Sequence, residues 1–170
     1  MDVKQYTLRK RIIAIGSDYD VIDSSENVIY VIDGKARFAK TFVLKDSNGK
    51  KLLRIREKLM SLDNMMEIQR NEETIATVTK LRSDTVPYKF EVKNSDNLMM
   101  EARGTFYEQS EIRITRGDAH IATMSRKAYT ITREIFYINM EQGEDEALLL
   151  AIGAALIALV DYHGELSSTT

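Results

Sequence analysis

The sequence predicts a mainly β protein: a closed antiparallel barrel of about 12 strands around a hydrophobic C-terminal α-helix. Short segments in which apolar and polar residues alternate recur along the chain, as in half-buried strands. Polar turn sequences separate these segments with a period of roughly 23 residues. Near the C-terminus, segment 146–160 has no polar face, so its surface must be covered on all sides.

The strands are predicted from the turns between them. Clusters of Asp, Asn, Ser and Gly close hairpins because these residues accept positive φ angles or bond to their own backbone. Such clusters lie at 23–27, 46–49, 70–73, 94–97 and 116–119. Five hairpins, with further strands at about 3–15 and 131–140, give roughly 12 strands in all. A sandwich is the alternative, but large sheets tend to curl, and closure removes their exposed edges.

The apolar segment 146–160 fits the lumen of such a barrel. Side chains fill a barrel of eight strands, whereas a larger barrel leaves space inside, and a helix is about 10–12 Å across. The acidic residues at 144–146, after Gly143, suit a helix N-terminus, and Gly164 suits its end. A membrane tail anchor is the alternative, but the run is shorter than the roughly 20 residues that a bilayer needs and lacks flanking cations. We therefore predict a single domain over 1–170, a central helix at 146–160 and a flexible tail at 164–170.

Composition indicates an ordinary globular protein. The formal net charge of −2 carries no general signature of nucleic-acid binding, and the absence of cysteine excludes thiolate sites and disulfides. The N-terminus lacks the pattern of a signal peptide, so we expect a cytoplasmic protein without a transmembrane segment. Segment 28–32 is apolar on both faces, which favours its being covered by a terminal segment, a partner protein or a second copy of the chain.

Three stretches of the sequence carry a distinctive pattern, at 34–38, 42–62 and 145–150. The second contains D-x-N-G-K-x-L-x-x-I-R-x-K, which begins at Asp46, and the third is an acidic lead-in to an Ala/Leu-rich helix. In these stretches the chain resembles the LURP-one-related family. The family is grouped with tubby C-terminal domains and phospholipid scramblases, so the resemblance implies a barrel of twelve strands around a central helix. It also implies several roles, since tubby domains bind phosphoinositides and scramblases are linked to lipid movement and calcium.

The sequence lacks recognisable catalytic or metal-binding motifs. His120 and His163 have no neighbouring residues at metal-ligand spacing, and Asp18 and Asp20 do not continue into a calcium-loop pattern. Nucleophile-elbow and phosphate-loop motifs are absent from the sequence. We therefore expect a non-enzymatic binding or scaffold module that carries no cofactor and no metal.

Basic residues provide the candidate binding site. The residues that we assign to phosphate headgroups are Lys35, Arg37, Arg54, Arg56 and Lys58. The last three alternate along one strand and so share a solvent face, which suits peripheral binding of acidic phospholipids, phosphoinositides included. Exposed Lys and Arg also serve solubility. The alternatives are therefore a protein-interaction or structural module, in one form homodimeric, and a carrier of a small hydrophobic ligand. We interpret the methionines at 60, 65, 66, 99 and 100 as core residues that fill gaps.

Overall fold

A computed structural model of the chain describes residues 2–11, 18–35, 39–82, 88–96, 99–106, 110–127 and 134–164, without the side chains of 161–164. Its strands are β1 (Val3–Lys10), β2 (Tyr19–Ile22), β3 (Val28–Lys35), β4 (Thr41–Asp46), β5 (Lys51–Glu57), β6 (Asn64–Arg70), β7 (Glu73–Lys80), β8 (Tyr88–Asn94), β9 (Met99–Gly104), β10 (Glu111–Arg116), β11 (Ala119–Arg126) and β12 (Ile135–Glu141). The helix is α1 (Glu146–Gly164).

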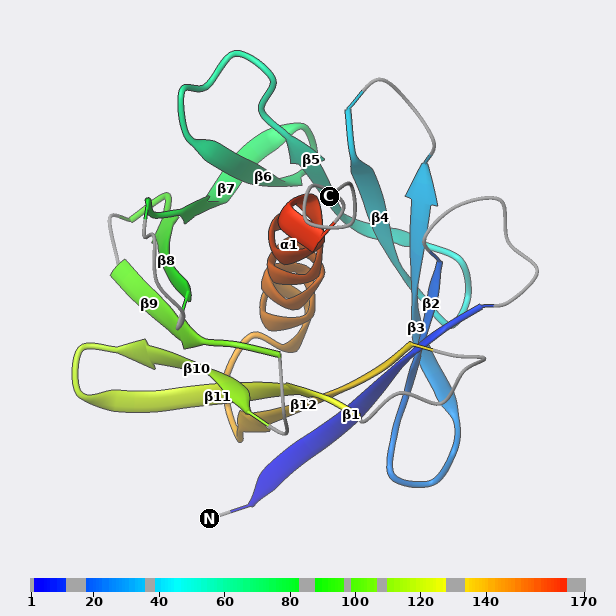
Figure 1. Cartoon of the computed structure of the whole chain (residues 1–170). Helices are drawn as coiled ribbons and strands as arrows, with labels where there is room; N and C mark the ends of the chain where they lie inside the picture. The colour runs from blue at the N-terminus through cyan, green and yellow to red at the C-terminus, as the bar shows by residue number, and fades with distance from the viewer. Residues whose placement is uncertain are drawn as a thin grey trace.

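In the part of the chain that the structure describes, twelve antiparallel strands form a closed barrel (Figure 1). Each strand pairs with its neighbours in the chain, and β1 pairs with β12 to close the ring. The five predicted hairpins are confirmed as β2–β3, β4–β5, β6–β7, β8–β9 and β10–β11. The predicted fold class is therefore confirmed. The first strand ends at Lys10, earlier than predicted, and residues 12–17 and 131–133 lie outside the described residues.

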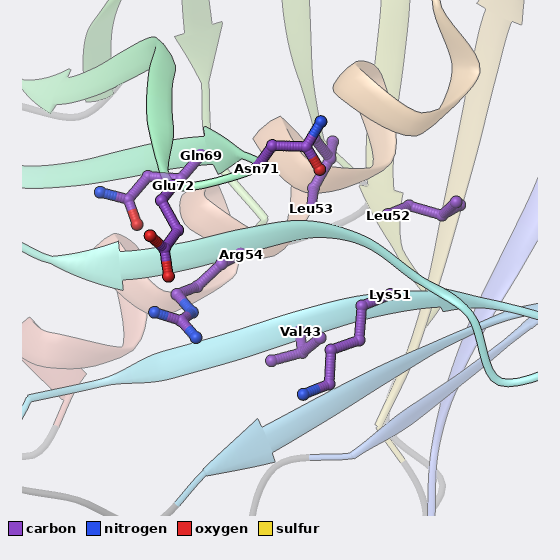
Figure 2. Close-up of a pocket in the computed structure, with 8 residues that line it drawn as sticks. All are labelled: Val43, Lys51, Leu52, Leu53, Arg54, Gln69, Asn71 and Glu72. Carbon is purple, nitrogen blue, oxygen red and sulfur yellow. The ribbon is translucent and has the colours of Figure 1, made fainter.

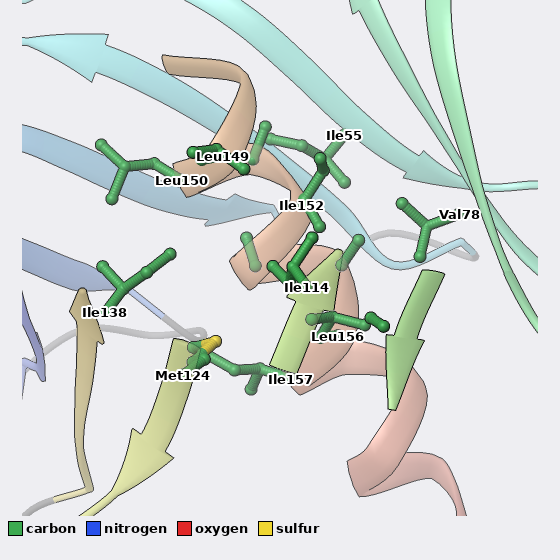
Figure 3. Close-up of a cluster of buried hydrophobic side chains, with 14 of the residues drawn as sticks. Ile55, Val78, Ile114, Met124, Ile138, Leu149, Leu150, Ile152, Leu156 and Ile157 are labelled. Carbon is green, nitrogen blue, oxygen red and sulfur yellow. The ribbon is translucent and has the colours of Figure 1, made fainter. Parts of the chain in front are cut away.

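Helix α1 lies inside the barrel (Figure 1), and every residue from 149 to 160 is buried. Figure 3 shows its Ile152 and Leu156 among side chains of the surrounding strands, such as Ile114. Gly153 permits a close approach to the wall, because a Cβ atom there would lie 3.3 Å from the Sδ atom of Met124. Among the described residues, no helix combines the length and apolar character needed to cross a bilayer.

The N-terminus of α1 is capped and charged as predicted. The Asp145 Oδ1 atom accepts a hydrogen bond from the backbone N–H of Leu148 at 3.0 Å, which is an N-cap contact. The Glu146 carboxylate pairs with Lys4 and accepts a hydrogen bond from the Tyr6 hydroxyl at 2.6 Å. These contacts join the helix to β1. The helix continues to Gly164, beyond its predicted end at 160, and residues 165–170 of the predicted tail lie outside the described residues.

Candidate functional site

Strand register brings the basic residues of β3 and β5 together on the outer wall. Lys35 on β3 is opposite Thr41 on β4, which in turn is opposite Arg56 on β5. Because adjacent strands are about 4.8 Å apart, the backbones of Lys35 and Arg56 are separated by roughly 10 Å. Both side chains are exposed, whereas the neighbouring Ile55 is fully buried in the barrel. Lys35 therefore lies two strands from Arg56 on the same outer wall.

The same register adds cations that were not among the predicted site residues. Lys45 on β4 is opposite Lys51 on β5, next to the row in which Val43 faces Arg54. The hairpin predicted at 46–49 indicates that β4 and β5 pair, but its flanking residues are Lys45 and Lys50. A register shift between Leu44 and Lys45 places Lys51 opposite Lys45 instead. We define the basic face by its residues on β3, β4 and β5 and just after β5: Lys35, Lys45, Lys51, Arg54, Arg56 and Lys58. Arg37, the remaining predicted site residue, lies outside the described residues.

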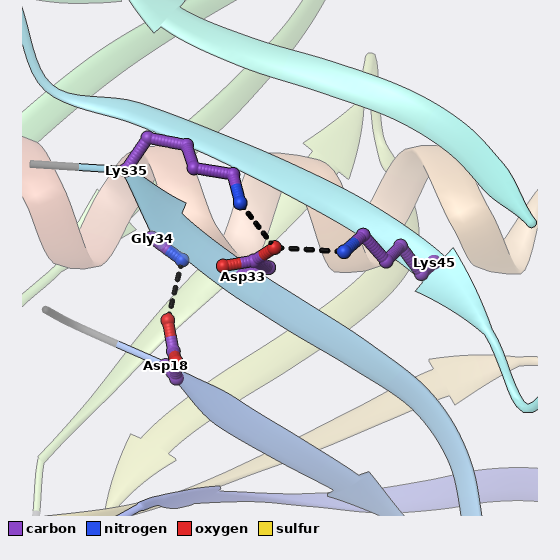
Figure 4. A network of polar contacts seen from close by, with 5 residues as sticks. All are labelled: Asp18, Asp33, Gly34, Lys35 and Lys45. Atoms are coloured by element: carbon purple, nitrogen blue, oxygen red, sulfur yellow. Dashed lines mark hydrogen bonds and ion pairs between the residues drawn. The ribbon is translucent and has the colours of Figure 1, made fainter. Parts of the chain in front are cut away.

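Asp33 neutralises part of the basic face. Its Oδ2 atom accepts hydrogen bonds from the Nζ atoms of Lys35 and Lys45, both at 2.7 Å (Figure 4). These two ammonium groups lower the pKa of Asp33 below its ordinary value, the hydrogen bond from Lys35 being the larger cause. The next residue of β3 is bonded as well, since the backbone N–H of Gly34 donates to Asp18 Oδ1 at 2.7 Å (Figure 4). Asp33 therefore holds two cations of the face in place.

Glu67 on β6 neutralises a second part. Its carboxylate lies 3.3 Å from the Arg56 guanidinium and 3.6 Å from the Lys58 ammonium. Both cations remain about half exposed, at 49% and 48% of their side-chain surface. The Glu67 side chain itself is only 13% exposed, so a phosphate group would reach Arg56 and Lys58 from their exposed sides without displacing this carboxylate.

Arg54 differs from these residues because, within the described residues, no carboxylate pairs with it. It lies beside a groove of about 200 Å³. Figure 2 shows Arg54 and Gln69 on one side of this groove and Lys51 on the other. Gln69 on β6 is only 8% exposed, although it is opposite the exposed Arg54 and lines the same groove. The groove offers two cations and the side-chain amides of Gln69 and Asn71, which can donate to a phosphate group. Glu72 also lines the groove, and Figure 2 shows its carboxylate on the Arg54 side, so the cations outnumber the acid by two to one.

A second basic row lies elsewhere on the barrel. Lys89 on β8, Arg103 on β9 and Arg113 on β10 are opposite one another in register. Lys89 pairs with Glu101 at 3.2 Å and Arg113 pairs with Glu111 at 2.8 Å. Two of its three cations are therefore paired, each with an acid of its own, and the groove described above is not part of this row. It provides a matched control for the basic face.

Other predicted residues have different outcomes. His120 is exposed, and its ring nitrogen lies 3.3 Å from Glu141, while the side chain of His163 is not described. The described residues contain no cluster of three side chains suited to a metal ion. The interpretation of the methionines as core residues is confirmed for Met66 and Met100. It is wrong for Met60, which is 96% exposed because the chain turns away from the barrel there, and for Met99, which is 46% exposed. Met65 is half-buried.

The doubly apolar segment 28–32 forms most of β3. Its inner face is covered by the chain itself, because the Tyr30 hydroxyl donates to Glu146 at 3.4 Å and its ring packs edge-on against Tyr6. Ile32 is fully buried, and Val28 is 39% exposed. The inner face of β3 therefore has an intramolecular cover.

Comparison with known families supports the resemblance noted in the sequence. The family model described as LURP-one-related matches residues 4–157, from the first strand into the helix. A comparison with curated proteins found no match to the chain.

Proposed function

This chain belongs to the LURP-one-related family, and we propose that it is a non-enzymatic module that binds acidic phospholipid headgroups peripherally through the basic face. One observation carries the proposal. Five cations of the neighbouring strands β3, β4 and β5, with Lys58 just after β5, lie beside a groove in which Arg54 forms no ion pair within the described residues.

The chemistry of the basic face suits phosphate. A guanidinium group can donate two parallel hydrogen bonds to phosphate oxygens, and Arg54 is free to do so. Each Lys or Arg near an anionic membrane contributes about 1 kcal/mol to the free energy of binding, so several such residues together can hold the protein at the membrane surface. Because these charges are exposed, the binding should weaken steeply with salt.

Co-sedimentation with vesicles tests the proposal. The wild type is compared with R54Q/R56Q/K58Q on vesicles of phosphatidylcholine alone, with phosphatidylserine, and with a phosphoinositide at matched charge, each at two salt concentrations. We expect salt-sensitive binding to the anionic vesicles and its loss in the variant. Stronger binding to the phosphoinositide than to phosphatidylserine would show recognition of the headgroup beyond its charge.

The control variant is K89Q/R103Q/R113Q, which removes an equal number of positive charges, three, from the second basic row. We expect it to bind nearly as well as the wild type. Equal losses of vesicle binding in the two variants would mean that binding depends on the net charge of the protein and not on the basic face. If no anionic vesicle binds the wild type at low salt, headgroup binding is wrong, and the protein-interaction alternative is the one to pursue.

A further inference from the structure

The loop between β5 and β6 exposes three large apolar side chains. Leu59 is 63% exposed, Met60 is 96% exposed and Leu62 is 93% exposed. Figure 1 shows this loop extending away from the barrel wall. Isolated apolar residues are common on protein surfaces. Three exposed large apolar side chains within four positions of a projecting loop are not typical of a freely solvated loop.

The backbone of this loop is held in a defined shape. The N–H of Lys58 donates to the carbonyl of Met65 at 3.0 Å, which closes the base of the loop. The N–H of Ser61 donates to the carbonyl of Lys58 at 3.4 Å, and the N–H of Asp63 donates to the Ser61 hydroxyl at 3.2 Å. Leu59 and Met60 therefore lie at the centre of a turn whose backbone bonds are made locally. The loop presents its apolar side chains without first having to become ordered.

Charge indicates what this apolar tip contacts. Lys58 begins the loop and belongs to the basic face. Arg54 and Arg56 precede it, on the same side of β5. Glu57, Asp63 and Glu67 are the acids close by. Glu67 is already paired with Arg56 and Lys58, and Glu57 accepts a hydrogen bond from the backbone N–H of Lys40 at 3.3 Å. A convex apolar tip next to exposed cations matches the layering of an anionic bilayer, in which acyl chains lie beneath charged headgroups.

We propose that Leu59, Met60 and Leu62 insert into the interfacial region of an anionic bilayer while the basic face contacts its headgroups. This inference rests on the proposed function and adds an apolar anchor to it. Membrane binding then has two components: an electrostatic one that salt screens, and an apolar one that salt does not.

The absence of tryptophan from the chain allows a direct test. In Met60→Trp the new indole is the sole tryptophan, and Met99→Trp places the same reporter on β9, at a site that is 46% exposed. Fluorescence is followed on phosphatidylserine-containing vesicles with and without brominated acyl chains. We expect a blue shift and quenching for Met60→Trp, and neither for Met99→Trp.

Binding measurements separate the two components. L59S/M60S/L62S changes only exposed side chains, so we expect it to fold as the wild type does, which far-UV circular dichroism checks. We expect its vesicle partitioning to fall by at least about tenfold. This deficit should persist at about 1 M salt, where charges more than about 3 Å apart are screened, whereas the deficit of R54Q/R56Q/K58Q should disappear.

The outcomes distinguish the two proposals. If the wild type binds anionic vesicles but Met60→Trp is not quenched and the Ser variant binds equally well, insertion is wrong and headgroup binding stands. If the wild type binds no anionic vesicle, the proposed function fails and insertion fails with it. Quenching of Met60→Trp together with a salt-independent deficit in the Ser variant would support insertion.

Discussion

Asp33 is the residue that most limits the positive charge of the basic face, because one oxygen of its carboxylate accepts from two lysines. Asp33→Asn removes one negative charge and releases Lys35 and Lys45. We expect binding to anionic vesicles at low salt to increase about fivefold, which corresponds to about 1 kcal/mol for one charge near the membrane. Co-sedimentation measures this change.

The control for that variant is Glu101→Gln, which removes one negative charge beside Lys89 in the second basic row. We expect a clearly smaller gain there. An equal gain in both variants would mean that vesicle binding follows net charge alone and that the position of Asp33 is irrelevant.

In the β6–β7 turn, the backbone conformation of Glu72 lowers the stability of the folded protein. Asn71 and Glu72 both have positive φ angles, 50° and 71°, as a type I′ turn requires. A glutamate in this conformation is strained, whereas glycine accepts it. We expect Glu72→Gly to raise the free energy of unfolding by about 1 kcal/mol in urea titrations. Glu73→Gly, one position later in β7, should instead lower it by about 0.5–1 kcal/mol, and the opposite order would contradict this account of the turn.

At the scale of elements, the enclosure of α1 is the property most open to test. Ala154 is 3% exposed and lies within the core cluster. In Ala154→Asp the carboxylate would be buried without a partner, which costs several kcal/mol of a total stability of about 5–15 kcal/mol. We expect this variant to lose its cooperative unfolding transition in circular dichroism.

The same substitution in the first turn of the helix is the matched control. Ala147 is half-buried, and a helix N-terminus favours acidic side chains. We therefore expect Ala147→Asp to fold cooperatively. Cooperative unfolding of Ala154→Asp with unchanged stability would show that the helix is not enclosed in solution.

At the scale of the whole molecule, Glu146 connects the helix to the seam where the barrel closes. It pairs with Lys4 and accepts from Tyr6 on β1, the strand that pairs with β12. Burial acts to raise the pKa of Glu146, but the hydrogen bonds from Lys4 and Tyr6 outweigh it and lower the pKa below its ordinary value of 4.5. Burial, and then the Glu146 carboxylate, raise the pKa of Tyr6.

A lowered pKa in the folded state sets the sign of the pH dependence. The charged form of Glu146 stabilises the fold above the ordinary pKa, and this stabilisation is lost as the pH falls through the lowered folded-state value. We expect Glu146→Gln to unfold more easily than the wild type at pH 7, by about 1 kcal/mol or less because Lys4 is 48% exposed. The difference should vanish well below pH 4, as urea titrations at both pH values would measure. An undiminished difference at low pH would indicate lost packing in place of lost charge.

The sequence by itself determined the features that depend on near neighbours in the chain. Alternation along β5 placed Arg54 and Arg56 on one face, and Asn48-Gly49 marked a hairpin, because side-chain direction and turn conformation are local properties. The uniformly apolar segment 146–160 required enclosure, since no face of it could remain in water.

Only the tertiary structure decided which charges of the candidate site are free. Pairing of β3 with β4 brought Lys45 to Asp33. Pairing of β5 with β6 brought Glu67 to Arg56 and left Arg54 without an ion pair within the described residues. The outward path of the loop that holds Met60 was equally invisible in the sequence. The physical reason is the same in each case: pairing and exposure depend on segments distant in the chain, and the composition of one segment does not specify which of them will lie beside it.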